Sequence, residues 1–140
     1  MLTWMVIIPS LIHFFSTNQV NSLLYIGIII GLLGVRIRYS SMKNLGRFYS
    51  RNIGVQGEHS IVQSGWYQYI RHPGYLGTFL TYLGFAISTS SLTAVGINIV
   101  LFFIAYSYRI NVEEQTLISK FGEKYRQFQH KTWRLIPFLY

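Results

Sequence analysis

Polar residues that could bind a ligand stand at an abrupt change from polar to apolar sequence. The first group is the string Arg71-His72-Pro73-Gly74-Tyr75. Proline has no N–H to donate and suits the first turn of a helix, so we expect a helix to begin at Pro73. The N–H groups of Gly74, Tyr75 and Leu76 would then lack partners inside that helix. Such a helix start can hold a polar or anionic ligand group.

A second polar group, Arg109 with Glu113 and Glu114, lies directly after a long apolar run. Residues four apart share one face of a helix, so Arg109 and Glu113 are expected to lie close together. Adjacent helical residues point in different directions, so both glutamates cannot pair with Arg109. An exposed ion pair would contribute only about 0.3–0.5 kcal/mol, whereas an ionisable residue at a membrane boundary marks a candidate site. The sequence leaves a structural pair and a functional site equally open.

Several other chemistries find little support in the residues. His59 and His72 have no further histidine or glutamate at metal-ligand spacing, so we expect no metal site. A Gly-x-Ser-x-Gly elbow, a Gly-x-Gly-x-x-Gly fingerprint and a Walker loop are all missing from the sequence. Cysteine is absent, which excludes cysteine nucleophiles and thiolate ligands.

The composition indicates that a membrane positions these residues. Of the 140 residues, 51% are hydrophobic and only 11% are charged, and the mean hydropathy is +0.32. These values lie outside the usual range of a soluble domain. Backbone groups inside a bilayer must bond internally, so the apolar runs predict helices. We expect an all-α integral membrane protein that forms a single domain over residues 1–140.

The distribution of charge predicts the topology. The formal net charge is +8, but the basic residues fall into two stretches and do not suggest a nucleic-acid partner. Short turns at residues 16–19 and 88–91 carry no Lys or Arg. The positive-inside rule therefore places both basic stretches on the cytoplasmic side. The basic residues are Arg36, Arg38, Lys43, Arg47, Arg51 and Arg71 in one stretch, and Arg109, Lys120, Lys124, Arg126, Lys131 and Arg134 in the other.

Apolar runs predict about four transmembrane helices. They cover about residues 2–15, 23–35, 73–89 and 92–108. The first is expected to be a retained span, because it has no basic n-region and no small-residue cleavage site. The third is a marginal span, because a crossing needs about 20 residues. Residues 36–70 are too polar to cross, and we expect an ordered loop there.

Two further patterns predict how the helices pack. Gly27 and Gly31 have the spacing that lets membrane helices approach closely. Apolar residues from Leu117 to Phe128 recur every three to four positions, which predicts a cytoplasmic amphipathic helix at the membrane face. Gly122 is a possible interruption of this helix. The aromatic residues around Pro137 predict a segment that docks at the interface.

Several separated motifs occur in order between about residues 45 and 137. They are His59-Ser60-Ile61-Val62, Gly65-Trp66-Tyr67, Arg71-His72-Pro73-Gly74-Tyr75-Leu76-Gly77, Arg109 with Glu113-Glu114, Leu117, Phe121-Gly122, Tyr125 and Ile136-Pro137. In these motifs the chain resembles the isoprenylcysteine carboxyl methyltransferases, which are integral-membrane enzymes. The related phospholipid N-methyltransferases share part of the pattern.

The resemblance implies binding of S-adenosylmethionine at the cytoplasmic membrane face, without a Rossmann domain. It implies a lipid-like or prenylated acceptor, whose carboxylate Arg109 would orient. Methylation of a phospholipid amine or a thiol is an alternative within the same class. A sterol- or steroid-reductase-like enzyme using NADPH is the alternative from another class, and a non-catalytic scaffold is a third. The implied cofactor contacts are Gln56, His59, Ser60, Ile61, Val62, Tyr67, His72, Pro73, Gly74, Tyr75 and Glu113.

Overall fold

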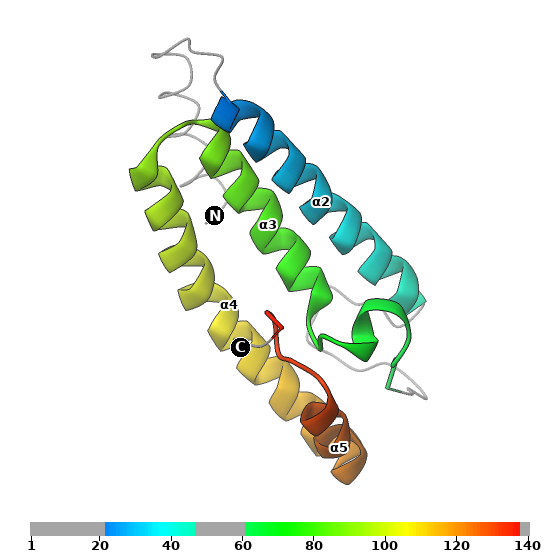
Figure 1. Ribbon diagram of the computed structural model, residues 1–140. Helices are drawn as coiled ribbons and strands as arrows, with labels where there is room; N and C mark the ends of the chain where they lie inside the picture. Colours follow the sequence, from blue (N-terminus) through cyan, green and yellow to red (C-terminus); the bar gives the residue numbers. More distant parts are fainter. Residues whose placement is uncertain (1–21, 47–60, 138–140) are drawn as a thin grey trace. The chain divides into compact units, whose positions relative to one another are not determined.

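The computed structural model describes residues 22–46 and 61–137 of the chain. Within these ranges every regular element is a helix, as Figure 1 shows, and strand-like pairing is limited to one isolated bridge. This agrees with the expected all-α fold. The elements are α2 (Ser22–Leu45), the short 3₁₀ helix η2 (Gly65–Gln68), α3 (Pro73–Ser88), α4 (Leu92–Phe121) and α5 (Glu123–Lys131).

Two of these helices are long and apolar enough to cross a membrane. They are α2, with 24 residues, and α4, with 30 residues. Helix α3 has 16 residues, which is fewer than the roughly 20 that a crossing needs. The apolar run at residues 2–15 lies outside the described residues, so the expectation of about four spans stays a prediction.

Helix α2 extends farther than the hydropathy of the sequence indicated. The predicted loop was to begin at Arg36, but the helix continues to Leu45 and the chain turns only at Gly46, whose φ is +52°. Loss of hydropathy ends a membrane span, but it does not end a helix. Residues 36–45 contain no proline or glycine to break the backbone pattern. The expectation of a loop was therefore wrong for these residues.

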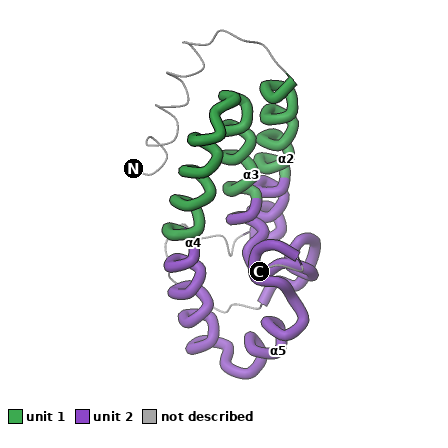
Figure 2. The backbone as a smooth tube through the Cα atoms, turned by 60° about the vertical axis from the view of Figure 1, so that its left-hand side comes forward, with its two compact units in different colours: residues 1–36, 77–105 green, residues 37–76, 106–140 purple. Residues whose placement is uncertain are grey.

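The chain divides into two compact units, which Figure 2 shows in different colours. Unit 1 contains residues 1–36 and 77–105, and unit 2 contains residues 37–76 and 106–140. Helices α2, α3 and α4 each contribute residues to both units. The prediction of a single domain stays a prediction.

In unit 1, glycines bring the backbones of α2 and α3 into direct contact. A Cβ added to Gly84 would lie 2.5 Å from the carbonyl oxygen of Gly27 and 2.8 Å from the Cα of Gly31. A Cβ added to Gly34 would lie 2.5 Å from the Thr81 nitrogen. Gly84 thus packs directly against Gly27 and Gly31. This contact confirms the predicted role of Gly27 and Gly31 in close helix packing. The rings of Phe79 and Phe102, whose centroids lie 4.8 Å apart with planes tilted by 49°, pack α3 against α4.

In unit 2, a short parallel pairing holds two distant segments together. Ile70 and Trp133 form the isolated bridge, with Arg71 N–H donating to the Trp133 carbonyl at 2.8 Å and Trp133 N–H to the Tyr69 carbonyl at 2.9 Å. Among the described residues of this unit, the buried apolar side chains are those of Ile70, Ile110, Tyr125, Phe128 and Leu135.

Helix α5 is the amphipathic helix that the spacing predicted. Tyr125 and Phe128 are buried, while Lys124 and Arg126 are exposed. Gly122, with φ +54° and ψ −127°, separates α5 from α4, so the interruption expected at this glycine is present. Such backbone angles suit glycine because it has no Cβ.

Candidate functional site

Helix α3 begins at Pro73, as the sequence predicted. The residue before it, His72, closes the first turn, because its carbonyl accepts the N–H groups of Tyr75 at 3.1 Å and Leu76 at 3.2 Å. The expectation that these two N–H groups would be available to a ligand was therefore wrong. The residue before a helix commonly accepts its first hydrogen bonds, and His72 does so here.

The segment before α3 is fixed by residues far away in the sequence. His72 N–H donates to the Arg134 carbonyl at 3.2 Å, next to the bond from Arg71 N–H to Trp133. Within the tail, Leu135 belongs to the core of unit 2, whereas Trp133 is exposed, and docking of the tail at the interface stays a prediction. Leu135 is only 1% exposed.

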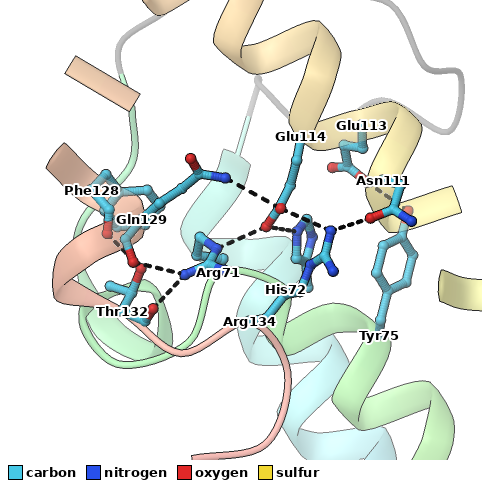
Figure 3. A network of polar contacts seen from close by, with 10 residues as sticks. All are labelled: Arg71, His72, Tyr75, Asn111, Glu113, Glu114, Phe128, Gln129, Thr132 and Arg134. Atoms are coloured by element: carbon cyan, nitrogen blue, oxygen red, sulfur yellow. Dashed lines mark hydrogen bonds and ion pairs between the residues drawn. The ribbon is translucent and has the colours of Figure 1, made fainter. Parts of the chain in front are cut away.

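Glu114 is the centre of a buried network of polar contacts (Figure 3). Its Oε1 lies 2.8 Å from Arg71 Nε and 3.2 Å from His72 Nε2. Its Oε2 lies 3.0 Å from Arg134 Nη2 and accepts a bond from Gln129 Nε2 at 3.2 Å. A buried carboxylate is stable only when its oxygens are bonded in this way. Glu114 thus joins α4, α5, the start of α3 and residue 134.

Arg71 also stabilises the end of α5. Its Nη1 donates to the carbonyl of Gln129 at 3.0 Å and to the carbonyl of Thr132. The last carbonyls of a helix lack partners inside it and carry the negative end of its dipole, so a cation is favourable there. One guanidinium therefore joins the end of α5 to Glu114.

Glu113 takes part in a separate set of contacts at the start of α3. The Tyr75 hydroxyl donates to Glu113 Oε2 at 2.7 Å and accepts a bond from Arg109 Nε at 2.8 Å. The Arg109 guanidinium also lies 5.8 Å from the centre of the Tyr75 ring. Arg109 and Glu113, which the sequence placed on one helix face, are therefore joined through a tyrosine that the sequence had placed in the other polar group.

Ring packing links the two sets of contacts. The rings of His72 and Tyr75 are stacked, with centroids 5.6 Å apart and planes 19° apart. Tyr106 packs its ring against Tyr75 with centroids 5.2 Å apart. The orientation of Tyr75 therefore depends on His72, whose ring Glu114 holds.

The charged side chains of the site differ in their exposure to solvent. The side chains of His72 and Glu114 are 4% and 7% exposed, while Arg109 is exposed. Burial raises the pKa of the Tyr125 hydroxyl above its ordinary value, and the nearby Glu114 carboxylate adds to this effect. Tyr125 is therefore neutral near physiological pH and adds no charge beside the network. Among residues 22–46 and 61–137, no three histidine, aspartate or glutamate side chains form a group that could hold a metal ion.

The structure brings together some of the predicted site residues. His72, Pro73, Tyr75, Arg109 and Glu113 meet at the start of α3. Gly74 belongs to the same first turn. Ile61, Val62 and Tyr67 lie in the segment that leads to α3, and their role as cofactor contacts stays a prediction. Gln56, His59 and Ser60 lie outside the described residues.

Five polar residues of the network were absent from the predicted site. Arg71 and Glu114 each had a signal, since they directly precede or follow predicted site residues. Gln129 and Arg134 had none, because they come from α5 and from the segment after it. Asn111 lies on α4 between Arg109 and Glu113, so its position also gave a signal. Arg134 Nη2 also donates to Asn111 Oδ1.

Comparison with known proteins assigns the chain to a family. The sequence model described as the isoprenylcysteine carboxyl methyltransferase (ICMT) family matches residues 25–119, which include α3 and both glutamates. The chain belongs to the isoprenylcysteine carboxyl methyltransferase family. A solved structure described as the eukaryotic intramembrane Ras methyltransferase ICMT has the same fold, with a TM-score of 0.87 and 24% identity, over 96% of this chain and 52% of that one.

Individual relatives agree with this family. Protein-S-isoprenylcysteine O-methyltransferase of Dictyostelium discoideum is 31% identical over 89% of this chain and 54% of its own length. The protein of the same description from Xenopus laevis is 34% identical over 87% of this chain and 43% of its own length. Methanethiol S-methyltransferase of Crocosphaera subtropica is 35% identical over 52% of this chain and 28% of its own length. The chain thus spans about half the length of the first two relatives.

Family membership and the two long apolar helices support assignment of the chain as a membrane protein.

Proposed function

We propose that this protein transfers a methyl group from S-adenosylmethionine to the carboxylate of an isoprenylcysteine-like acceptor. The observation that carries this proposal is the Tyr75 hydroxyl, which joins Arg109 and Glu113 within the region that the family model matches. It holds a cation suited to a carboxylate acceptor beside an anion suited to a cationic cofactor.

The residues at the start of α3 fit such a cofactor chemically. S-adenosylmethionine carries an ammonium and a sulfonium, and when bound it supplies the activated methyl group. Glu113 offers an anionic partner for these charges, and a carboxylate that accepts one bond from Tyr75 retains capacity for more. The implied contacts remain those of the family resemblance. They are Gln56, His59, Ser60, Ile61, Val62, Tyr67, His72, Pro73, Gly74, Tyr75 and Glu113.

Methylation of a carboxylate requires little acid–base chemistry from the protein. The acceptor is already ionised near neutral pH, so no residue has to remove a proton. Alignment and exclusion of water are what the chain must provide. Arg109 is the proposed partner of the acceptor carboxylate, because guanidinium bonds to carboxylates are strong and directional. Its Nε bond to Tyr75 fixes the direction of that guanidinium.

We also propose that both basic stretches and the site face the cytoplasm. The support is the distribution of Lys and Arg along the sequence. Acceptor lipid chains would then reach the site from the bilayer, and the soluble cofactor would arrive from the aqueous side.

Methyl-transfer assays with purified protein test the reaction. Labelled S-adenosylmethionine is offered with an S-farnesylcysteine analogue, a phospholipid extract or a small alkyl thiol. We expect label in the farnesylcysteine ester. Label only in the thiol would contradict the carboxylate acceptor and favour thiol methylation, the reaction named for the Crocosphaera relative. Equilibrium binding of NADPH but not of S-adenosylmethionine would contradict the proposal and favour a reductase.

A variant of Arg109 tests its role separately. Arg109→Ala is expected to raise the acceptor KM about tenfold or more, the range for loss of a charge-assisted hydrogen bond, with less effect on cofactor binding. Arg126→Ala is the control, because Arg126 is also an exposed arginine of unit 2. If Arg109→Ala abolished cofactor binding and left acceptor affinity intact, the assignment to the acceptor would be wrong.

A further inference from the structure

Residue 134 contacts His72 by two separate routes. Its carbonyl accepts the His72 N–H at 3.2 Å, which fixes the backbone of His72. Its guanidinium lies 3.0 Å from Glu114 Oε2, and the other oxygen of Glu114 lies 3.2 Å from His72 Nε2. The second route fixes the imidazole ring. Arg134 thus fixes both the backbone and the side chain of His72.

His72 passes this support on to Tyr75. Its carbonyl closes the first turn of α3 by accepting the Tyr75 N–H, and its ring stacks on the Tyr75 ring. The hydroxyl of Tyr75 is the group that joins Arg109 to Glu113. A shift of His72 would therefore move the residues proposed to contact both substrates.

We infer that Arg134 is a positioning residue, which holds His72 and, through it, Tyr75 in the geometry that binds S-adenosylmethionine. The inference rests on the proposed function and extends it to Arg134, which is not one of the implied cofactor contacts. Arg134 also lies beyond residues 25–119, the part of the chain that the family model matches. Residues 133–134 are therefore part of the site, although they follow all of its proposed ligand contacts in the sequence.

The arginine side chain suits this role better than other residue types. Its Nη2 contacts both Glu114 Oε2 and Asn111 Oδ1, which a planar guanidinium can do in one fixed orientation. Without it, Oε2 would keep the Gln129 amide as its donor. A neutral amide forms a weaker bond than a charged group, so the carboxylate and the His72 ring would lose their fixed orientation.

Arg134→Gln and Arg134→Lys test the inference in the full chain, purified in detergent. Equilibrium titration gives the Kd for S-adenosylmethionine, and initial rates at saturating S-adenosylmethionine give the acceptor KM for the farnesylcysteine analogue. We expect a Kd about tenfold higher for Arg134→Gln and a smaller increase for Arg134→Lys, with the acceptor KM rising in the same order because Tyr75 also orients Arg109. Arg126→Gln removes one positive charge from α5 and is expected to leave both values unchanged.

The outcomes separate this inference from the proposed function. A wild type that binds no S-adenosylmethionine overturns both. A wild type that binds, with a Kd for Arg134→Gln within twofold of it, overturns the inference alone. So does an equal loss in Arg126→Gln, which would indicate a general effect of charge. A variant that lowers Tm while its folded fraction keeps the wild-type Kd shows a merely structural role. If Arg134→Gln does not fold, an unchanged Kd in Arg134→Lys overturns the inference.

Discussion

Glu113 and Glu114 are neighbours in sequence, but they have different partners. Glu113 accepts a bond from Tyr75 at the start of α3, whereas Glu114 is buried among Arg71, His72 and Arg134. Successive helical residues point about 100° apart, so a pair of acids can serve two sites. Glu113 is the proposed cofactor contact, and Glu114 holds the surrounding segments together.

The Tyr75 hydroxyl can be tested by removing a single oxygen. Tyr75→Phe keeps the ring that stacks on His72 but removes the bonds to Arg109 and Glu113. Hydrogen bonds to charged groups contribute about 1.5–3 kcal/mol, so kcat/KM for methyl transfer should fall about tenfold to a hundredfold. Tyr69→Phe is the matched control, because Tyr69 is 64% exposed. Equal activity in the two variants would contradict the role given to Tyr75.

The main expected effect of Glu114→Gln is a lower free energy of unfolding. It would leave the guanidinium groups of Arg71 and Arg134 without their carboxylate in a buried setting. Breaking a buried ion pair in this way costs about 3–5 kcal/mol. We expect a clear fall in the free energy of unfolding, measured by thermal or denaturant unfolding in detergent. Glu123→Gln, at an exposed position on α5, should change it little.

At the scale of elements, glycine and proline set where the helices begin, end and touch. Pro73 starts α3, Gly46 follows the end of α2, and Gly122 separates α4 from α5. In unit 1, Gly84 fits between Gly27 and Gly31 with no room for a side chain. In membranes such close contact contributes through packing, since lipid is as apolar as the helix surface.

A matched pair of alanine substitutions measures this contact. Gly84→Ala would place a methyl group 2.5 Å from the Gly27 carbonyl oxygen, whereas a Cβ at Gly96 would meet nothing within 4 Å. Overpacking costs about 1–3 kcal/mol, so Gly84→Ala should lower the midpoint of thermal unfolding. Gly96→Ala should leave it equal or raise it, because alanine favours a helix by up to about 1 kcal/mol over glycine. The reverse order would contradict the close contact of α2 with α3.

The elements also show why the sequence predicted only part of the site. Pro73 and Gly122 act locally, so the start of α3 and the break before α5 could be predicted from residue type. The end of α2 could not, because hydropathy reports the span and says nothing of the helix beyond it. Arg134 reaches Glu114 where residues 69–72 pair with 133–134, and Gln129 reaches it from α5, beyond the break at Gly122. No spacing rule connects segments so far apart.

At the scale of the whole molecule, the absence of cysteine makes the proposed topology directly measurable. Single cysteines at Ser90, in the turn without Lys or Arg, and at Lys124, in the second basic stretch, would be the only thiols of each variant. In sealed inside-out vesicles, a membrane-impermeant maleimide should label the cysteine at 124 and not that at 90. Labelling of both in leaky vesicles is the control. The opposite pattern would contradict the positive-inside assignment.

The pairing of residues 69–72 with 133–134 has a consequence for how the protein is made. Arg71 and Thr132, which are bonded to each other, lie 61 residues apart. A ribosome therefore delivers α3, α4 and α5 before the residues that fix His72 have been synthesised. Closing so long a loop is slow relative to helix formation. On the proposed function, the cofactor site of unit 2 would therefore be completed last during biosynthesis, and a nascent chain halted before Trp133 is expected to bind S-adenosylmethionine more weakly than the full chain.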